Sequence, residues 1–337
     1  MRVGFNPQKD RLLEPSPYFH QVVLPVYLPH ADGYFKDGLR ILQLCLTSLF
    51  RTMHGGTYVT VVNNGSSAEV REYLEARRAA GQIHEVVHTT NIGYINAMLK
   101  GVSGHRFPLL TTADSDVLFL NGWQEATYRV FRAFPKAGAV SPVPNSRMLR
   151  VMTANLLCER GLAASLRFGP VDDPEAMRAF AASIDRPDLY REVHLRRCLR
   201  IRENGVDAVV GAGHFVVTYR ADLFARLPRS TPYVMGGDSD DLFDRPVAEQ
   251  GFWRLSTPGS FALHMGNTLE PWMSARVDAV ADEGRPSSLA PALHRPRRWP
   301  FVDRFHLRVT SRVLFKGPVW RRFLRFKGLT REDAAQY

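Results

Sequence analysis

Blocks of apolar and polar positions alternate along the first third of the chain, and they predict strands and helices in turn. β-Branched apolar runs over 22–27 and 58–62 predict strands, and apolar residues at helical spacing over 39–53 predict a helix between them. The chain then predicts, in order, a helix over 68–80, a strand over 83–89, a helix opened by 91–93 and a strand over 109–113. Strands separated by helices favour an α/β fold with a mixed, mostly parallel sheet, flanking helices, and ligands at the carboxyl ends of the strands.

This rhythm breaks over residues 145–205, which are rich in arginine and helical in period. We expect this segment to be a helical insertion or a lid over the sheet. Residues 207–219 return to strand character, and beyond about residue 275 the pattern loosens into Pro- and Arg-rich sequence. The sequence therefore predicts one domain over 1–275 that contains the insertion, followed by a basic, aromatic-rich helical extension over 276–337.

Composition favours a globular protein in a reducing compartment. The chain has 337 residues, of which 45% are apolar, and this is enough for a large core. Cys45, Cys158 and Cys198 lie far apart without CxxC spacing, which disfavours a disulfide framework. The N-terminus shows no apolar leader, and no window of about 18 uninterrupted apolar residues occurs. We expect a cytoplasmic protein, with any membrane contact peripheral and at the inner face.

The apolar run over 109–113 ends in Asp114-Ser115-Asp116, and this is the clearest candidate for chemistry. In an extended chain alternate side chains point the same way, so both carboxylates can share one hard divalent ion. The plain alternative is that the two aspartates cap a helix beginning near Leu118.

Two further polar features lie downstream. Residues 236–245 form an acidic cluster, Gly-Gly-Asp-Ser-Asp-Asp-Leu-Phe-Asp-Arg, and His264 stands alone in an apolar segment. Together with the strand-end aspartates they indicate metal-assisted transfer of a phosphate-activated group. For His264 the alternative is a hydrogen-bonded histidine near the core.

Five motifs in order over roughly residues 20–268 resemble the GT-A glycosyltransferases, especially family 2. On the nucleotide-sugar side these are Pro25-Val-Tyr27, Val62-Asn63-Asn64-Gly65-Ser66, Asn91-x-Gly93-x-x-Asn96 and Asp114-x-Asp116. On the acceptor side, residues 236–245, Gly251 and His264 resemble the Gly-Gly-Glu-Asp-Asp-Asp segment of β-1,4-galactosyltransferase-type enzymes. The resemblance implies a Rossmann-like nucleotide-sugar-binding fold.

The resemblance also implies a role for each motif. Asp116 would bind Mn²⁺ or Mg²⁺ directly, Asp114 would bridge to the ribose or to metal-bound water, and His264 would complete the ligands, with the imidazole favouring Mn²⁺. The nucleotide sugar, with UDP the expected nucleotide, would contact Pro25, Tyr27, Asn63, Asn64, Asn91, Gly93, Asn96 and Asp114. The alternatives remain that Asn63-Asn64-Gly-Ser is simply a tight turn and that Asn91 is a helix cap.

The acceptor cluster departs from the family pattern. The catalytic base of the family falls on Ser239, and a serine hydroxyl does not accept a proton at neutral pH. A carboxylate near the acceptor hydroxyl is what inverting transfer needs. We expect Asp240 to be the base, with Asp238 the next candidate and Asp241 a ligand of the acceptor or of a helix N-terminus. The alternative is that these acids only complement a helix dipole.

The net charge of +11 lies mostly in residues 295–327, where eleven basic residues stand against one acid, Asp303. The body of the chain is therefore nearly neutral, which disfavours nucleic-acid binding. Val319, Trp320, Phe323 and Leu324 share one helical face, so we expect an interfacial helix on an anionic membrane. The alternative is a C-terminal helix docked on the body with a solvated basic face.

These observations predict an inverting, metal-dependent glycosyltransferase that moves a hexose from a UDP-sugar to a hydroxyl acceptor. A cell-surface glycan in polysaccharide biosynthesis or a lipid-linked precursor is the expected acceptor. One competing hypothesis is a haloacid-dehalogenase-like phosphatase, because Asp114-x-Asp116 and Gly237-Asp238-x-x-Asp241 mimic its motifs. Another is a non-catalytic pseudo-glycosyltransferase that binds only a nucleotide or a membrane.

Overall fold

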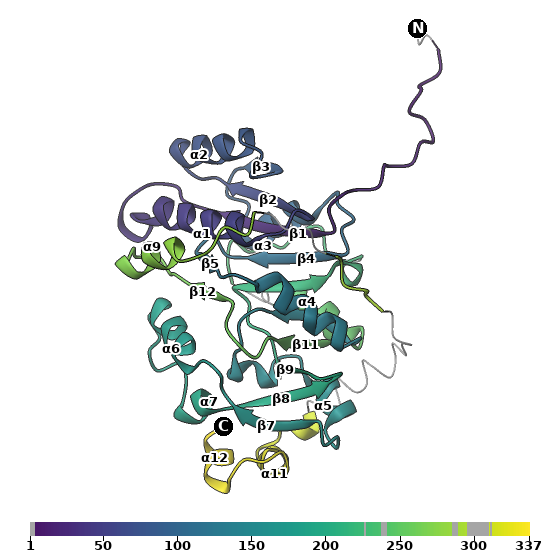
Figure 1. Cartoon of the computed structure of the whole chain (residues 1–337), viewed down its shortest axis with the longest axis vertical. Helices are drawn as coiled ribbons and strands as arrows, with labels where there is room; N and C mark the ends of the chain where they lie inside the picture. Colours follow the sequence, from purple (N-terminus) through teal and green to yellow (C-terminus); the bar gives the residue numbers. More distant parts are fainter. Residues whose placement is uncertain (1–3, 226, 237–240, 285–288, 295–309, 311) are drawn as a thin grey trace.

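A ten-stranded mixed sheet runs through the whole molecule, and helices cover both of its faces (Figure 1). The computed structural model describes residues 4–225, 227–236, 241–284, 289–294, 310 and 312–337. The strand order is β3-β2-β1-β4-β10-β6-β11-β9-β8-β7, and β12 and β5 form a separate two-stranded sheet. The prediction of an α/β fold with a mixed sheet and flanking helices is confirmed.

The first half of the chain builds the parallel part of the sheet. β1 pairs in parallel with β2 and β4, and β2 pairs in parallel with β3. The carboxyl ends of these strands therefore meet at one edge, as the sequence predicts. The elements are β1 (His20–Val26), a 3-10 helix (Gly33–Phe35), α1 (Gly38–Thr52), β2 (Thr57–Asn64), α2 (Ala68–Ala79), β3 (Glu85–Thr89), α3 (Tyr94–Val102), β4 (Leu109–Ala113), β5 (Val117–Phe119), α4 (Trp123–Ala133) and β6 (Ala137–Ser141).

The second half extends the sheet with mixed pairing. β10 runs antiparallel between β4 and β6, and β11 pairs in parallel with β6 and antiparallel with β9. The elements are a 3-10 helix (Ser146–Arg150), α5 (Ala154–Arg160), β7 (Leu166–Pro170), α6 (Pro174–Ser183), α7 (Glu192–Arg196), β8 (Arg197–Glu203), β9 (Val206–Val210), β10 (Val216–Arg220), a 3-10 helix (Ala221–Leu223), α8 (Asp241–Glu249), β11 (Trp253–Ser256), β12 (Ala262–His264), α9 (Pro271–Asp278), α11 (Gly317–Phe326) and α12 (Arg331–Gln336).

The segment 145–205 is not a purely helical insertion, so that expectation is wrong. It contributes α5, α6 and α7, but also β7 and β8, which form one edge of the main sheet. β8 pairs antiparallel with both β7 and β9. The many arginines favour a helix prediction for this segment. In β8, however, Arg200 and Arg202 alternate with the buried Leu199 and Ile201, which is the two-residue period of a strand.

The core lies on both faces of the central strands. Val22, Leu24 and Val26 of β1 pack in one cluster with α1, whereas Val23 packs in another with α3. Successive side chains of a strand point to opposite faces, so a strand covered on both faces reads as a continuous apolar run. This explains why the β1 segment shows no polar alternation.

The C-terminal helices dock on the body beside β7 (Figure 1). Trp320 and Leu324 of α11 are buried in a cluster that also contains residues of β6, β8 and β11. The backbone N–H of Phe168 in β7 donates to the carbonyl of Lys327 at 2.9 Å. Arg196 and Asp333 form an ion pair of 2.9 Å. Trp320, Leu324 and the partly buried Phe323, three of the four residues of the face predicted to seek lipid, therefore pack against the body, as the docked-helix alternative describes.

Helix α9 crosses the predicted domain boundary at residue 275, and Val277 and Val280 belong to the core cluster around α1. The ordered body therefore continues a few residues past that boundary. Among the helices that the structure describes, none is long and apolar enough to cross a membrane.

Candidate active site

Two aspartates reach the site because β4 is buried to its last residue and the chain then turns. All residues of Leu109–Ala113 are buried, and Asp114 and Asp116 follow directly. The chain continues into β5, which pairs with β12 so that His264 stands opposite Val117. The β5–β12 pairing thus brings a histidine from far along the sequence to the end of β4.

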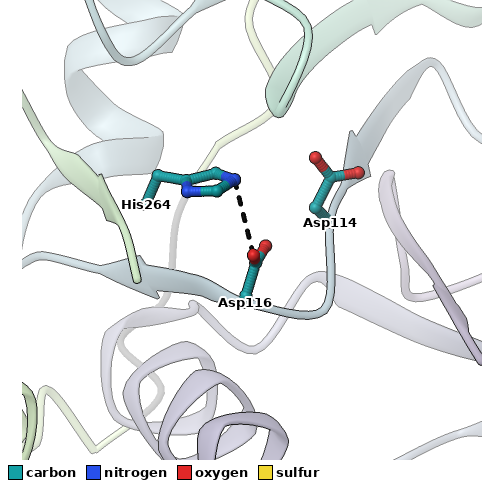
Figure 2. A group of neighbouring side chains, drawn as sticks. All are labelled: Asp114, Asp116 and His264. Atoms are coloured by element: carbon teal, nitrogen blue, oxygen red, sulfur yellow. Dashed lines mark ion pairs between the residues drawn. The ribbon is translucent and has the colours of Figure 1, made fainter. Parts of the chain in front are cut away.

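Figure 2 shows the side chains of Asp114, Asp116 and His264 turned toward one shared space. One ligand atom of each residue lies within 4.8 Å of those of the other two. Nε2 of His264 is 3.4 Å from Oδ2 of Asp116. The structure therefore brings together the three residues for which metal binding is predicted, and the helix-cap alternative fails because β5 follows the aspartates.

Neighbouring side chains hold this group in place. The hydroxyl of Tyr94, at the start of α3, donates to Oδ1 of Asp114 at 2.6 Å. Oγ of Ser183 in α6 lies 2.9 Å from Nδ1 of His264, so Nε2 is the ring nitrogen that faces Asp116. The ring of Phe215 meets the imidazole edge-on, with centroids 5.3 Å apart. Contacts from three different elements thus limit the side-chain rotamers of the site.

The electrostatics of the site suit a bound cation. Burial raises the pKa of the Asp116 carboxyl to about 7 and lowers the pKa of His264, because burial disfavours the charged form of each group. Oδ1 of Asp116 is buried and has no hydrogen-bond partner among the described residues. A divalent cation would satisfy that oxygen and favour the carboxylate form. Two carboxylates and one imidazole fit Mn²⁺ or Mg²⁺.

The asparagines at the end of β2 and after β3 form hydrogen bonds with each other and with nearby backbone groups. Asn63 accepts from the backbone N–H of Ser66 at 2.9 Å and lies 3.0 Å from Nδ1 of His88. Asn64 accepts from the N–H of Ile92 at 2.9 Å, and its Nδ2 donates to Asn91 at 3.3 Å. These bonds agree with the alternative of a side-chain-stabilised turn, and they fix the backbone beside which a nucleotide is predicted to bind.

Gly93 and Asn96 anchor the segment that leads to the acidic cluster. Gly93 has φ +92°, and a Cβ there would lie 2.5 Å from the carbonyl of Tyr233. Asn96 donates to the carbonyl of Thr231 at 2.9 Å and accepts from its N–H at 2.7 Å. The backbone N–H of Tyr94 donates to the carbonyl of Val234 at 2.8 Å. The Asn-x-Gly-x-x-Asn motif therefore ties the predicted nucleotide loops to residues 231–234, which precede the acidic cluster.

Pro25 and Tyr27 occupy different environments at the end of β1. Pro25 is buried within the strand opposite Val62. The ring of Tyr27 is 39% exposed and meets Phe35 edge-on, with centroids 5.8 Å apart. Only Tyr27 of the two offers an accessible face to a ligand.

The acidic cluster is described only from Asp241 onward. Asp238, Ser239 and Asp240 lie outside the described residues, and with them the resemblance to a β-1,4-galactosyltransferase-type motif. Asp241 begins α8 and forms an i,i+4 ion pair of 3.0 Å with Arg245. This arrangement matches the helix-terminus alternative for that one acid.

A cavity of about 460 Å³ adjoins the predicted metal site. Asp114 and His264 line it together with His214, Asn145 and Arg147. The rest of its wall is mainly apolar and includes Met148, Met177, Phe180, Tyr190 and Phe215. A largely apolar cavity with a few convergent polar groups is typical of a small-molecule site.

The structure adds a polar group that sequence reasoning missed. Nδ1 of His214 lies 3.2 Å from Oδ2 of Asp244, which is fully buried and 2.5 Å from the guanidinium of Arg254. The hydroxyl of Tyr219 donates to Oδ1 of the same carboxylate at 3.0 Å. Burial raises the pKa of Asp244, and the charge of Arg254 opposes that rise. These residues come from four separate segments, and the signal in the sequence is Arg254, a charged residue within the apolar run Phe-Trp-Arg-Leu.

The family comparison gives the class of protein. The parallel strands with polar loops at their carboxyl ends, and the strand-end Asp-x-Asp beside a histidine, agree with what the resemblance to GT-A glycosyltransferases implies. Residues 35–152 match the family described as glycosyl transferase family 2. The chain is a glycosyltransferase, and its match to family 2 is confined to those residues.

Solved structures of similar fold are distant in sequence. The mannosyltransferase PcManGT from Pyrobaculum calidifontis, in complex with GDP-Man and Mn²⁺, is 14% identical with a TM-score of 0.46, over 96% of this chain and 76% of that one. S. aureus TarS 1-349 is 12% identical with a TM-score of 0.42, over 77% and 62%. No curated protein sequence matches the chain. The assignment therefore depends on the family match and not on these neighbours.

Proposed function

We propose that the chain transfers a hexose from a nucleotide diphosphate sugar, with UDP as the nucleotide, to a hydroxyl acceptor with inversion at the anomeric carbon. The observation that carries this proposal is the group of Asp114, Asp116 and His264 beside a cavity at the carboxyl ends of the parallel strands. Asp116, Asp114 and His264 would hold Mn²⁺ or Mg²⁺. A bound cation of this kind offsets the negative charge that develops on the departing diphosphate.

The chain's own residues divide the remaining work. Tyr94 orients Asp114 through its 2.6 Å hydrogen bond, and Ser183 orients His264. Tyr27 offers the exposed ring against which a base can stack. The loops that surround the nucleotide are shaped by Pro25, Asn63, Asn64, Asn91 and Gly93. Asn96 keeps the segment at Thr231 near them.

The acceptor is proposed to be a cell-surface glycan or a lipid-linked precursor. In support, Arg321, Arg322 and Arg325 of α11 are exposed on a helix whose Phe326 is 62% exposed. Basic residues beside an exposed aromatic ring suit an anionic membrane surface. On this proposal the protein is peripheral at the cytoplasmic face of the membrane.

The test is nucleotide binding by calorimetry with UDP and GDP, in Mn²⁺ and in EDTA. We predict that UDP binds at least about tenfold more tightly in Mn²⁺, and that Asp116→Ala removes this difference because the cation loses a ligand. Asp172→Asn is the matched control, since that aspartate pairs with Arg200 beside β7 and is not among the predicted ligands. Equal affinity for UDP in EDTA and Mn²⁺ would take the metal out of the mechanism.

The same preparation distinguishes the competing functions. Hydrolysis of p-nitrophenyl phosphate would favour the phosphatase hypothesis. Nucleotide binding without turnover of any donor would favour the non-catalytic one.

A further inference from the structure

The resemblance to the family puts the position of the catalytic base on Ser239, and a serine hydroxyl does not accept a proton at neutral pH. The part of the chain that the structure describes offers a different group, because His214 lines the same cavity as Asp114 and His264. Its segment touches the predicted metal site directly: the backbone N–H of Asp114 donates to the carbonyl of Phe215 at 2.9 Å.

One nitrogen of His214 faces a carboxylate that has no exposure to solvent. Nδ1 lies 3.2 Å from Oδ2 of Asp244, and the side chain of Asp244 is 0% exposed. The histidine itself is 34% exposed, so its ring reaches the cavity. This ion-pair contact leaves Nε2 as the ring nitrogen available to the cavity and places a negative charge beside the ring. This is the arrangement of a base and its positioning acid.

The carboxylate is itself held rigidly. Arg254, also 0% exposed, lies 2.5 Å from Asp244 and donates to the carbonyls of Val151 at 2.6 Å and Ala212 at 2.9 Å. Tyr219 donates to the other oxygen of Asp244. Arg254 therefore binds both the carboxylate of Asp244 and the loop that carries His214.

The loop before His214 cannot move far. Gly211 has φ +105°, and a Cβ there would lie 2.7 Å from the carbonyl of Met148. Ser256 donates to the carbonyl of Gly211 at 3.0 Å. A base must be held within about 0.5 Å of its working position. The close approach at Gly211 and the bond from Ser256 both restrain this loop.

A purely structural role explains this group less well. Removing two charges from water is unfavourable, and apolar residues of the same size often give equal or greater stability at such positions. An ion pair buried under the wall of an active-site cavity is therefore better explained by chemistry than by stability. Charged or titratable groups that face His214 among the described residues are Asp244, Arg254, Tyr219, and across the cavity Asp114, His264, Arg147 and Tyr190.

We propose that His214 is the catalytic base of the transfer, with Asp244 as its positioning residue, a role that rests on the proposed function. Nε2 takes the proton of the acceptor hydroxyl as that oxygen bonds to the anomeric carbon. The bond between this carbon and the diphosphate oxygen breaks, and its electron pair leaves with the nucleoside diphosphate. The proton is later released from the imidazolium to solvent.

The experiment follows release of nucleoside diphosphate by the full-length protein with Mn²⁺ and UDP-glucose, UDP-N-acetylglucosamine or GDP-mannose, with water or a panel of simple glycosides as acceptor. His214→Gln should lower kcat by about 10²- to 10⁴-fold, the usual contribution of a base, with donor affinity unchanged. Imidazole added to His214→Ala should raise turnover in proportion to its concentration. His105→Gln is the matched control, since His105 also pairs with a carboxylate, Glu85 at 2.9 Å, but at the amino end of β3.

A pH series separates the base from the metal site. Turnover of the parent protein should fall as the pH falls, because the imidazole must be unprotonated to accept a proton. Donor affinity measured at the same pH values identifies any part of that fall that belongs to metal or nucleotide binding. Asp244→Asn should lower kcat less than His214→Gln does and should move the acidic limb of kcat.

Each remaining outcome decides against the proposal. If His214→Gln keeps full turnover, the base belongs to the acidic cluster. The same conclusion follows if imidazole does not rescue His214→Ala and Asp240→Asn loses as much turnover as His214→Gln. In that case the proposed function stands. No turnover of any donor by the parent protein overturns the proposed function and this inference with it.

Discussion

His20 is a fully buried histidine at the start of β1, and hydrogen bonds at both ring nitrogens stabilise its neutral form. Gly56 N–H donates to Nδ1 of His54 at 3.0 Å, so Nε2 of His54 carries the proton that Tyr128 accepts at 2.7 Å. The Tyr128 hydroxyl then donates to Nδ1 of His20, whose Nε2 donates to Thr111 at 2.6 Å. A proton added to Nδ1 of either imidazole would displace the hydrogen bond that this nitrogen accepts.

This network predicts that stability falls in acid. Burial lowers the pKa of His20, and burial lowers the pKa of His54 to about 4. An unfolded histidine titrates near about 6.5, so below that pH the unfolded chain binds protons that the folded chain does not. The free energy of unfolding therefore decreases from about pH 6.5 downward, by up to about 1.4 kcal/mol per pH unit for each histidine.

Urea unfolding at pH 7.5, 6.5 and 5.5 measures this effect. Burial raises the pKa of Asp116, which changes stability in the opposite sense over part of this range. The comparison is therefore between parent and His54→Gln at each pH, since glutamine can still donate to Tyr128. A smaller loss of stability in the variant is expected, and identical slopes would show that His54 is not involved.

At the scale of elements, α3 connects the nucleotide loops to the acceptor segment. Asn96 makes three hydrogen bonds, to the carbonyl of Ile92 and to both backbone groups of Thr231. The Asn96 side chain is therefore already hydrogen-bonded to the protein, and a nucleotide contact would come in addition to these three bonds. The position of residues 231–234 depends on α3 and not on their own sequence, which has no regular pattern.

Asn96→Ala should consequently affect the acceptor side more than the nucleotide side. Leaving these backbone groups unpaired should lower stability by about 1 to 3 kcal/mol. We expect kcat to fall more than tenfold, by the loss of acceptor positioning, while UDP affinity changes little. Asn121→Ala is the matched control, because Asn121 also anchors a remote segment, with bonds to Ala281 on both backbone groups.

This prediction is checked by measuring nucleoside diphosphate release and UDP binding by calorimetry for the two variants. A large loss of UDP affinity with unchanged kcat would instead support the direct nucleotide contact predicted from the sequence. Equal effects of Asn96→Ala and Asn121→Ala would reduce both residues to stabilising roles.

At the scale of the whole molecule, the C-terminal extension is both a structural part of the body and the most basic part of the chain. Trp320 and Leu324 are buried against the body. Truncation would expose this core, so the membrane proposal is better tested by charge changes on the exposed side. Arg321→Glu, Arg322→Glu and Arg325→Glu together reverse three exposed charges of α11 without touching its buried face.

The parent protein should co-sediment with vesicles containing anionic lipid at low salt and be released at high salt. Each basic residue near such a surface contributes about 1 kcal/mol, and salt screens this attraction. The triple variant should stay in the supernatant and keep donor turnover with a soluble acceptor. Parent protein that never sediments would rule out the membrane surface as a partner.

The sequence by itself determines what depends on neighbouring residues. Alternation of apolar runs with helical periods is local, so the parallel unit β1 to β4 could be predicted, as could the pair Asp114 and Asp116 at the end of a buried strand. That Asn91 and Gly93 open a helix follows from turn chemistry in the same way. Their place beside the nucleotide is what the resemblance implies. These signals survive in the linear chain because each comes from a short segment.

Only the tertiary structure decides which distant segments meet. His264 reaches Asp116 through the pairing of β12 with β5, and His214, Asp244 and Arg254 meet because β9, β10, α8 and β11 pack around one cavity wall. β7 and β8 become strands because the edge of the sheet offers them partners, despite their arginines. Hydrogen bonds and buried charge pairs between remote segments form only when the whole chain packs, so no local pattern encodes them.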